Sequence, residues 1–193
     1  MSCKYIVAIG SSAGGLDALK IFFDHTPLDS AAYFVLQHLP FDYQSKLNEI
    51  LRRYSELKIV QPRDGWEIVQ NHIYTLPPKM YLSVKDKKIR TIDRSILETT
   101  NFAFDIFLNS ISEDETLNVI AVVLSGGGAD GVEGITKIKQ VGGRVIAQDP
   151  HTCTHPFMPI NAINTGLVDY IVKPEAMPSL IHEKIIYEFS GTS

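Results

Sequence analysis

Short, almost wholly apolar segments recur along this chain, and most of them are followed by a segment with helical spacing. The clearest apolar segments are Tyr5–Ile9, Tyr33–Gln37 and Asn118–Leu124. Strands that are apolar on both faces are typical of parallel sheets covered by helices on each side. The alternation therefore predicts an α/β fold with a largely parallel sheet.

The segment 64–93 interrupts this alternation. Its short β-like pieces are His72–Leu76, Tyr81–Val84 and Lys88–Ile92, and the gaps between them are too short for crossover helices. Parallel strands need such crossovers, whereas antiparallel strands do not. We therefore expect a small antiparallel excursion in this segment, after which the alternation resumes.

The composition limits the classes of function. With 193 residues, 45% hydrophobic and 21% charged, the chain has the composition of an ordinary globular protein, and we expect one domain over residues 1–193. A net charge of -4 leaves no basic surplus for nucleic acid. No apolar run approaches the ~20 residues that cross a bilayer. Met1 leads into the first strand without a signal peptide, and two distant cysteines make no disulfide framework, so we expect a cytoplasmic location.

The first apolar segment ends in a serine turn. The run Gly10-Ser11-Ser12-Ala13-Gly14 fits G-x-S-x-G, the pattern of a nucleophile elbow, in which a tight strand-to-helix turn exposes one serine hydroxyl. Ser12 holds the central position, and we expect it to be the nucleophile. We expect Ser11 to point back along the strand and to make a local hydrogen bond.

Two further reactive residues follow apolar segments in the same way. His38 follows Tyr33–Gln37, and Asp130 follows Asn118–Leu124 and a run of glycines. Because ligands collect at the carboxyl ends of strands in an open α/β sheet, one cleft can hold both residues together with Ser12. An imidazole can accept the serine proton, and a carboxylate can orient the imidazole. The arrangement predicts a serine hydrolase.

The turn Ser125–Gly131 is rich in glycine, which lets backbone N–H groups approach a substrate oxygen, as an oxyanion hole requires. We expect Ala13, Gly127 and Gly128 to contribute to such a hole. A nucleotide-binding domain is the competing interpretation of the glycine turns. It is disfavoured because neither turn has a G-K-[ST] ending and no G-x-G-x-x-G follows the first strand.

Each candidate of the triad also has a structural interpretation. Ser12 can serve only as a helix N-cap, and His38 can be a loop histidine bonded to the backbone. Asp130 can cap the helix that we expect to begin at Gly131. Single residues therefore leave the function open, and their joint placement after three strands carries the prediction.

A metal site is the less favoured interpretation of one further cluster. His151, Cys153 and His155 alternate along a polar segment. Structural zinc generally takes four ligands from two separated pairs, and the sequence has no second pair. We therefore expect no metal and no organic cofactor.

Four blocks of sequence fall in a fixed order along nearly the whole chain. They are Ala8–Gly15, Gln37–Pro40, Leu124–Gly131 and Met158–Pro159. Together they resemble the signature blocks of the CheB chemotaxis methylesterase domain. The resemblance implies a three-layer, doubly wound α/β sandwich and an enzyme that removes methyl esters from glutamate side chains of chemoreceptors, often deamidating receptor glutamines as well. Carried over by position, it implies Ser12 as nucleophile, His38 as base and Asp130 as orienting carboxylate.

The chain also departs from the family pattern. The family usually carries an N-terminal receiver domain, and we expect none in residues 1–193, where the esterase block begins at once. Gly127 stands where the chemotaxis enzymes commonly have Met, and Asn101–Asp105 replaces the usual Arg-Pro-Ser-Val-Asp. The blocks Leu124–Gly131 and Gly166–Asp169 are closer to esterase domains fused to methyltransferase and sensor-kinase modules. The resemblance thus implies a protein substrate and such modules as partners, with a catalytically degenerate sensory or scaffold domain as the alternative.

Overall fold

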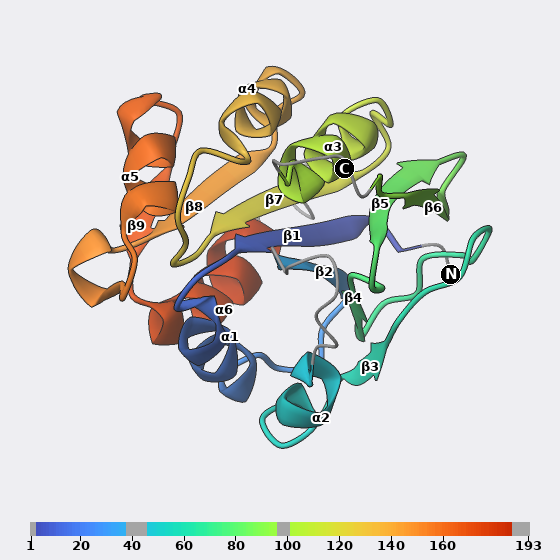
Figure 1. Cartoon of the computed structure of the whole chain (residues 1–193), viewed down its shortest axis with the longest axis horizontal. Helices are drawn as coiled ribbons and strands as arrows, with labels where there is room; N and C mark the ends of the chain where they lie inside the picture. The colour runs from blue at the N-terminus through green and yellow to red at the C-terminus, as the bar shows by residue number, and fades with distance from the viewer. Residues whose placement is uncertain (1–2, 38–45, 96–100, 187–193) are drawn as a thin grey trace.

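The centre of the fold is a seven-stranded sheet in the order β3-β4-β2-β1-β7-β8-β9 (Figure 1). The structure is a computed structural model that describes residues 3–37, 46–95 and 101–186. All neighbouring strands of this sheet run parallel. The strands are β1 (Tyr5–Ser11), β2 (Ala31–Gln37), β3 (Lys58–Val60), β4 (His72–Thr75), β7 (Asn118–Val123), β8 (Arg144–Gln148) and β9 (Tyr170–Val172). The predicted parallel sheet is confirmed.

Helices cover both faces of the sheet. On one face lie α3 (Ala103–Ile111), α4 (Val132–Gln140) and α5 (Phe157–Asn164), and on the other lie α1 (Gly15–Asp24), α2 (Leu47–Leu51) and α6 (Met177–Ser179) (Figure 1). Shorter elements are η1 (Pro150–Thr152), η2 (Pro174–Ala176) and the π-helical η3 (Leu180–Ile186). This arrangement confirms the three-layer, doubly wound architecture.

The central strand β1 contributes to two separate cores. Ile6 and Ala8 pack with residues of α3, α4 and α5, whereas Val7 and Ile9 pack with residues of α1 and α2. Successive side chains of a strand point to opposite faces of the sheet. Because helices bury both faces here, the strand is apolar at every position, which explains the unbroken apolar run in the sequence.

The antiparallel part of segment 64–93 is smaller than expected. β5 (Met80–Lys85) and β6 (Lys88–Asp93) form an antiparallel pair that packs beside α3. The piece beginning at His72 was expected in this excursion, but it is β4 and pairs in parallel with β2 and β3. The irregular connection 61–71 is long enough to return the chain to the same end of the sheet, so no crossover helix is needed between β3 and β4.

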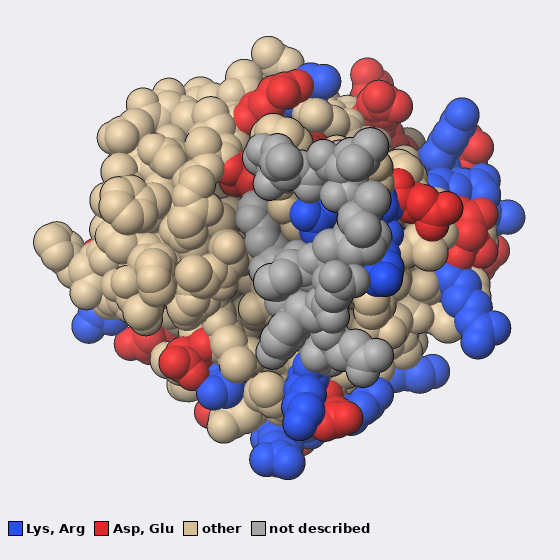
Figure 2. Space-filling view, viewed as in Figure 1, with Lys and Arg blue, Asp and Glu red and all other residues tan. Residues whose placement is uncertain are grey.

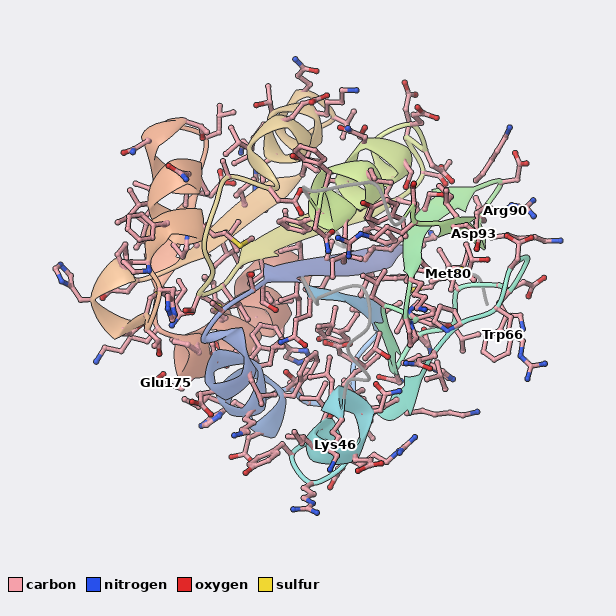
Figure 3. All side chains as sticks on the ribbon, in the orientation of Figure 1. Lys46, Trp66, Met80, Arg90, Asp93 and Glu175 are labelled. Atoms are coloured by element: carbon pink, nitrogen blue, oxygen red, sulfur yellow. The ribbon has the colours of Figure 1, made fainter. Side chains whose placement is uncertain are left out.

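Charged and aromatic side chains project from the region of β5 and β6. Figure 3 shows Trp66, Arg90 and Asp93 together at this side of the molecule. Trp66 is 42% exposed, and Arg90 forms an exposed ion pair of 3.4 Å with Asp64. Among the described helices, none combines the length and the apolar character that a membrane crossing requires.

Candidate active site

The winding of the sheet reverses at β1, and this reversal positions the candidate site. β1 pairs with β2 on one side and with β7 on the other, and the helices that follow β1 and β7 cover opposite faces. Ligands of doubly wound sheets bind at the carboxyl ends of the strands beside such a reversal. β1 ends at Ser11, directly before Ser12, and β7 ends at Val123, in register with Gly10.

Ser12 lies in the turn between β1 and α1. Its backbone N–H donates to the carbonyl of Ser125 at 3.1 Å, and its own carbonyl accepts from the N–H of Gly15 at 3.0 Å. Gly14, with φ of 73°, is the N-cap of α1, and no side chain caps this helix. The interpretation of Ser12 as an N-cap is therefore wrong. The half-buried Ser12 occupies a tight strand–turn–helix geometry, as the elbow pattern predicts.

The neighbouring Ser11 faces the interior. Its side chain is fully buried, and its Oγ has no hydrogen-bond partner within the described part of the chain. The expected local hydrogen bond of Ser11 is thus wrong. The side chain instead packs so closely on Gly15 that a Cβ added there would lie 2.7 Å from the Cβ of Ser11.

The glycine-rich turn after β7 lies against Ser12. A Cβ added to Gly126 would lie 3.0 Å from the Cβ of Ser12 and would overlap the Sδ of Met158. Only glycine fits at this contact. The turn is fixed from α5, because the N–H of Met158 donates to the carbonyl of Gly126 at 3.0 Å.

Several backbone donors of the two turns have no acceptor within the described residues. They are the N–H groups of Ala13, Gly127 and Gly128. The N–H of Gly126 is engaged with the carbonyl of His155 at 2.9 Å. The three residues predicted for the oxyanion hole are thus among those whose N–H groups have no acceptor in the described part of the chain, and their role stays a prediction.

Ser125 holds the two turns together, a role that the sequence analysis missed. Its Oγ donates to the carbonyl of Ala13 at 3.1 Å and accepts from the N–H of His155 at 3.1 Å. Its N–H donates to Oε1 of the buried Gln148 at 2.9 Å. A polar residue directly after a buried strand was the only sequence signal for this role.

Asp130 is buried beside the N-terminus of α3. Its Oδ2 accepts from the N–H of Phe104 at 2.9 Å, and its Oδ1 accepts from the N–H of Asp105 at 2.8 Å. The capping interpretation expected this carboxylate at the start of α4, but the N-cap of α4 is Gly131, and no side chain caps that helix from this position. Asp130 thus accepts from two N–H groups of the first turn of α3 that have no partner within the helix.

Asp105 is a second buried carboxyl group next to Asp130, and the sequence analysis missed its importance. Its Oδ1 accepts from the N–H of Gly134 at 2.7 Å. Burial raises the pKa of Asp105 to about 6, the N–H groups of Gly134 and Gly131 oppose this rise, and the charge of Asp130 adds to it. The available signal was a charged residue inside the apolar stripe of α3.

The base expected from the sequence, His38, lies outside the described residues. The last described residue before it is Gln37, at the end of β2. Gln37 pairs with Ser11, the residue before Ser12.

Phe104 joins α3 to the site. Its ring fills the space beside Gly10 and Gly131, and a Cβ added to either glycine would overlap this ring. Gly131 also has a φ of 100°, which favours glycine. The end of β1 and the turn carrying Asp130 therefore pack on one aromatic side chain.

One border of the surface beside Ser12 is formed by a segment without formal charge. The segment 150–168, which includes η1 and α5, contains no Asp, Glu, Lys or Arg. It borders the serine turn at His155, whose Nδ1 would lie 3.2 Å from a Cβ added to Gly14, and it borders the glycine turn at Asn161, whose Nδ2 donates to the carbonyl of Gly128 at 2.7 Å. Figure 2 shows an uncharged face over α5 and charged side chains around β5 and β6. We call 150–168 the uncharged segment.

No group of three or more His, Cys, Asp and Glu side chains comes together to hold a metal ion within the described ranges 3–37, 46–95 and 101–186. Burial raises the pKa of the Cys153 thiol to about 11.

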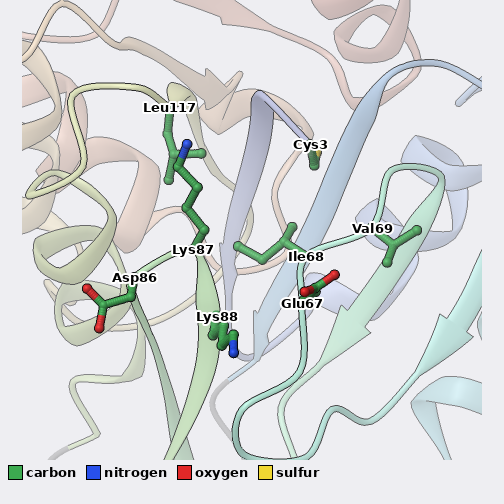
Figure 4. Close-up of a pocket in the computed structure, with 8 residues that line it drawn as sticks. All are labelled: Cys3, Glu67, Ile68, Val69, Asp86, Lys87, Lys88 and Leu117. Carbon is green, nitrogen blue, oxygen red and sulfur yellow. The ribbon is translucent and has the colours of Figure 1, made fainter. Parts of the chain in front are cut away.

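A hollow of about 460 Å³ lies at the other end of the sheet (Figure 4). Its lining residues are Cys3, Glu67, Ile68, Val69, Asp86, Lys87, Lys88 and Leu117. Cys3 precedes β1 and Leu117 precedes β7, so the hollow adjoins the amino ends of these strands. It is not part of the candidate active site, which lies at their carboxyl ends.

Comparison with known proteins supports the same assignment of the fold. The family model for CheB methylesterase matches residues 7–181. The crystal structure of the Thermotoga maritima CheB methylesterase catalytic domain is 32% identical in sequence and superposes with a TM-score of 0.81, covering 93% of this chain and 97% of that chain.

Two curated relatives are similar over most of the chain. The protein-glutamate methylesterase/protein-glutamine glutaminase of Thermotoga maritima is 32% identical over 185 residues, which are 93% of this chain and 54% of the relative. A putative protein of the same name from Leptospira interrogans is 32% identical over 178 residues, 90% of this chain and 91% of the relative. The chain thus spans about half the length of some relatives, including 50% of the one from Photorhabdus laumondii. The family model and the matching catalytic-domain structure together show that this chain belongs to the CheB methylesterase family.

Proposed function

We propose that this chain is a protein-glutamate methylesterase domain in which Ser12, His38 and Asp130 form the catalytic triad. The observation that carries the proposal is the shared register of three strands. β1, flanked by β2 and β7, ends beside both of them, and each of the three strands is followed in sequence by one of these residues. The substrates are methylated glutamates of chemoreceptor-like proteins, and glutamine side chains are a second substrate by the same chemistry.

The reaction follows from the chemistry of the triad. Ser12 Oγ attacks the γ-carbonyl carbon of the ester while His38 accepts the serine proton. The tetrahedral intermediate collapses, and methanol leaves with the proton from His38. Water, deprotonated by His38, then attacks the acyl-enzyme, which releases the glutamate carboxylate and restores Ser12.

The oxyanion of the intermediate needs preorganised donors near Ser12. The backbone N–H groups of Ala13, Gly127 and Gly128 have no acceptor among the described residues and belong to the two turns that meet at Ser12. Gly127 replaces a methionine of the chemotaxis enzymes, but a backbone donor survives this exchange. The function of the oxyanion hole is therefore compatible with glycine at position 127.

The competing proposal is a scaffold domain in which Asp130 only caps α3. The two hydrogen bonds from Phe104 and Asp105 favour this alternative. A carboxylate has about four lone-pair sites, so two backbone donors leave capacity for an imidazole N–H. Asp130 can therefore cap α3 and orient His38 at the same time. A measurement of esterase activity decides between the enzyme and the scaffold.

We place the domain in the cytoplasm. Both Cys3 and Cys153 are free thiols, as in proteins of a reducing compartment. The proposal of fused methyltransferase or kinase modules as partners rests on the family resemblance of the glycine-rich block.

A fluorophosphonate probe tests the enzyme against the scaffold, because it reacts with an activated serine. We expect the wild type to be labelled and Ser12→Ala to lose labelling with a nearly unchanged melting temperature. Ser11→Ala is the matched control: it removes the neighbouring hydroxyl and should keep labelling, and because the lost hydroxyl is buried without a partner, stability should stay equal or rise by up to about 1 kcal/mol.

His38→Ala should lose as much activity as Ser12→Ala, because members of a triad act as a unit. Methyl ester hydrolysis by the wild type should fall as the pH drops through the imidazole range, since protonated His38 cannot accept the serine proton. A folded wild type that is not labelled would favour the scaffold, and a flat pH profile would point to another base.

A further inference from the structure

The N-termini of α3 and α4 are capped reciprocally by two neighbouring carboxyl groups. Asp130, in the turn before α4, accepts from the N–H groups of Phe104 and Asp105, the second and third residues of α3. Asp105 in turn accepts from the N–H of Gly134, the third residue of α4. Each helix thus supplies donors to a carboxyl group from the neighbourhood of the other helix.

The two carboxyl groups are both buried, and their charges act on each other. Asp105 is 9% exposed and Asp130 is 8% exposed. Burial raises the pKa of Asp105 to about 6, and the charge of Asp130 adds to this rise. Above that pH, Asp105 adds a negative charge to the neighbourhood of Asp130.

The position of Asp130 depends on its hydrogen bonds to α3 because the residue lies outside any helix or strand. It belongs to the glycine-rich turn, in which Gly128 and Gly131 both have positive φ. Its carboxylate accepts from the N–H groups of Phe104 and Asp105, so a shift of the start of α3 would move these donors away from it.

We propose that Asp105 is a positioning residue of the esterase: its carboxylate joins the start of α3, whose N–H groups hold the Asp130 carboxylate, to the start of α4, and so keeps Asp130 in the orientation that aligns His38. This inference rests on the proposed triad and adds a fourth residue to it. A catalytic group must be held to within about 0.5 Å of its productive geometry, so loss of this support should lower turnover more than substrate binding.

The charged groups near Asp105 determine how replacing it by a neutral residue changes the charge around Asp130. Among the described residues, Asp130 is the titratable group whose charge acts on Asp105, and the contacts from α4 are backbone N–H groups. Glu133, the other acidic residue near this end of α4, is exposed. Replacement of Asp105 by a neutral residue therefore removes one negative charge from the neighbourhood of Asp130.

The test compares Asp105→Ala with Asp105→Asn in hydrolysis of a glutamate γ-methyl ester peptide and in fluorophosphonate labelling. Asp105→Ala should lower kcat and the labelling rate by at least about 10-fold and change KM by less than about twofold. Asp105→Asn keeps an oxygen that accepts from the N–H of Gly134, so it should lose less than about threefold. Its acid-side pH midpoint should also shift to lower pH, because one negative charge that favours imidazolium is gone.

Asp29→Ala is the matched control for a purely structural loss. The Asp29 carboxylate also accepts two hydrogen bonds, from the N–H of Ala31 at 2.8 Å and the hydroxyl of Tyr33 at 2.6 Å, but at the amino end of β2, far from the site. It should lower the melting temperature and leave the acid-side midpoint of the pH profile unchanged.

The outcomes separate this inference from the proposed function. If the wild type is labelled and Asp105→Ala keeps its rate, or if Asp29→Ala loses as much kcat at equal loss of stability, the role of Asp105 is overturned and the triad stands. If Asp105→Ala fails to fold, the pH profile of Asp105→Asn decides, and an unshifted midpoint overturns the role. A wild type that is not labelled overturns the triad and the role of Asp105 together.

Discussion

The Asp130 side chain accepts hydrogen bonds from α3 and, in the proposed triad, orients His38. The substitution Asp130→Asn separates the effect on stability from the effect on turnover. In Asp130→Asn, one of the two acceptors for the α3 N–H groups becomes an NH₂ donor that faces a donor. We expect a loss of about 1–3 kcal/mol in the free energy of unfolding. The amide also cannot stabilise an imidazolium, so turnover should fall by about 10²- to 10⁴-fold. Urea denaturation and ester hydrolysis on the same preparation measure both effects.

The size of the activity loss identifies the role of Asp130. With several kcal/mol of stability remaining, a loss of about 1–3 kcal/mol leaves most molecules folded, so a cap alone would leave turnover nearly intact. Near-normal turnover in folded Asp130→Asn would remove Asp130 from the catalytic machinery.

At the scale of single residues, the sequence was informative where a pattern fixes the backbone. The G-x-S-x-G run predicted the strand–turn–helix geometry around Ser12, because small residues are required there, and the position of Gly14 against Thr154 shows why. Asp105 was not found, since its importance arises from burial against Gly134, more than 25 positions away, which no local pattern encodes. The catalytic roles of Ser12, His38 and Asp130 stay predictions.

At the scale of elements, the glycines of the glycine-rich turn differ in the space that a side chain would find, as Gly127 and Gly131 show. A Cβ at Gly127 would meet no atom of the described residues within 4 Å, and the φ of Gly127 is not in the left-handed region. A Cβ at Gly131 would overlap the ring of Phe104 in α3, at a backbone φ of 100°. We expect Gly127→Met, which restores the residue of the chemotaxis enzymes, to unfold at nearly the wild-type temperature.

Gly131→Ala should lose about 2–4 kcal/mol, since strain and overlap act together. It should also lower turnover by moving the turn that carries Asp130. Thermal denaturation of the two variants measures the contrast, and equal destabilisation would contradict the packing of Phe104 against this turn.

The carboxyl pair between α3 and α4 makes the stability of the domain depend on pH. The pKa of Asp105 rises from 3.8 to about 6 on folding, so the folded chain holds this proton more tightly than the unfolded chain. The favourable contribution is complete below about pH 3.8 and is lost as the pH rises through about 6.

Asp105→Asn is neutral at every pH, so its free energy of unfolding relative to the wild type should increase between about pH 4 and pH 7. The expected gain is on the order of 2 kcal/mol, and urea denaturation at both pH values measures it. A difference that does not change with pH would show that Asp105 titrates normally.

The sequence predicted elements well where both faces of a strand are buried and poorly where the chain is short and irregular. β1, β2 and β7 were evident as apolar runs. β4 was assigned to the antiparallel excursion because it stands close in sequence to β5 and β6, although its partners are β2 and β3. Pairing of a four-residue strand depends on tertiary contacts rather than on its own residues.

At the scale of the whole molecule, different features lie at the two ends of the parallel strands. The carboxyl ends hold the turns around Ser12, and the amino ends adjoin the hollow lined by Cys3 and Leu117. The antiparallel pair β5–β6, with its lysines, contributes to the latter region. The chain therefore keeps its charged hairpin apart from the candidate site.

The uncharged segment has a consequence for how the domain meets its substrate. Encounter rates that depend on attraction between charges fall steeply with ionic strength, because salt screens them over about 10 Å. On the border formed by the 19 residues 150–168, which carry no formal charge, salt has little to screen. We therefore expect kcat/KM for a methyl ester peptide to vary by less than about twofold between about 20 mM and 500 mM salt, so that recognition here depends on shape and apolar contact and stays constant as the ionic conditions of the cell change.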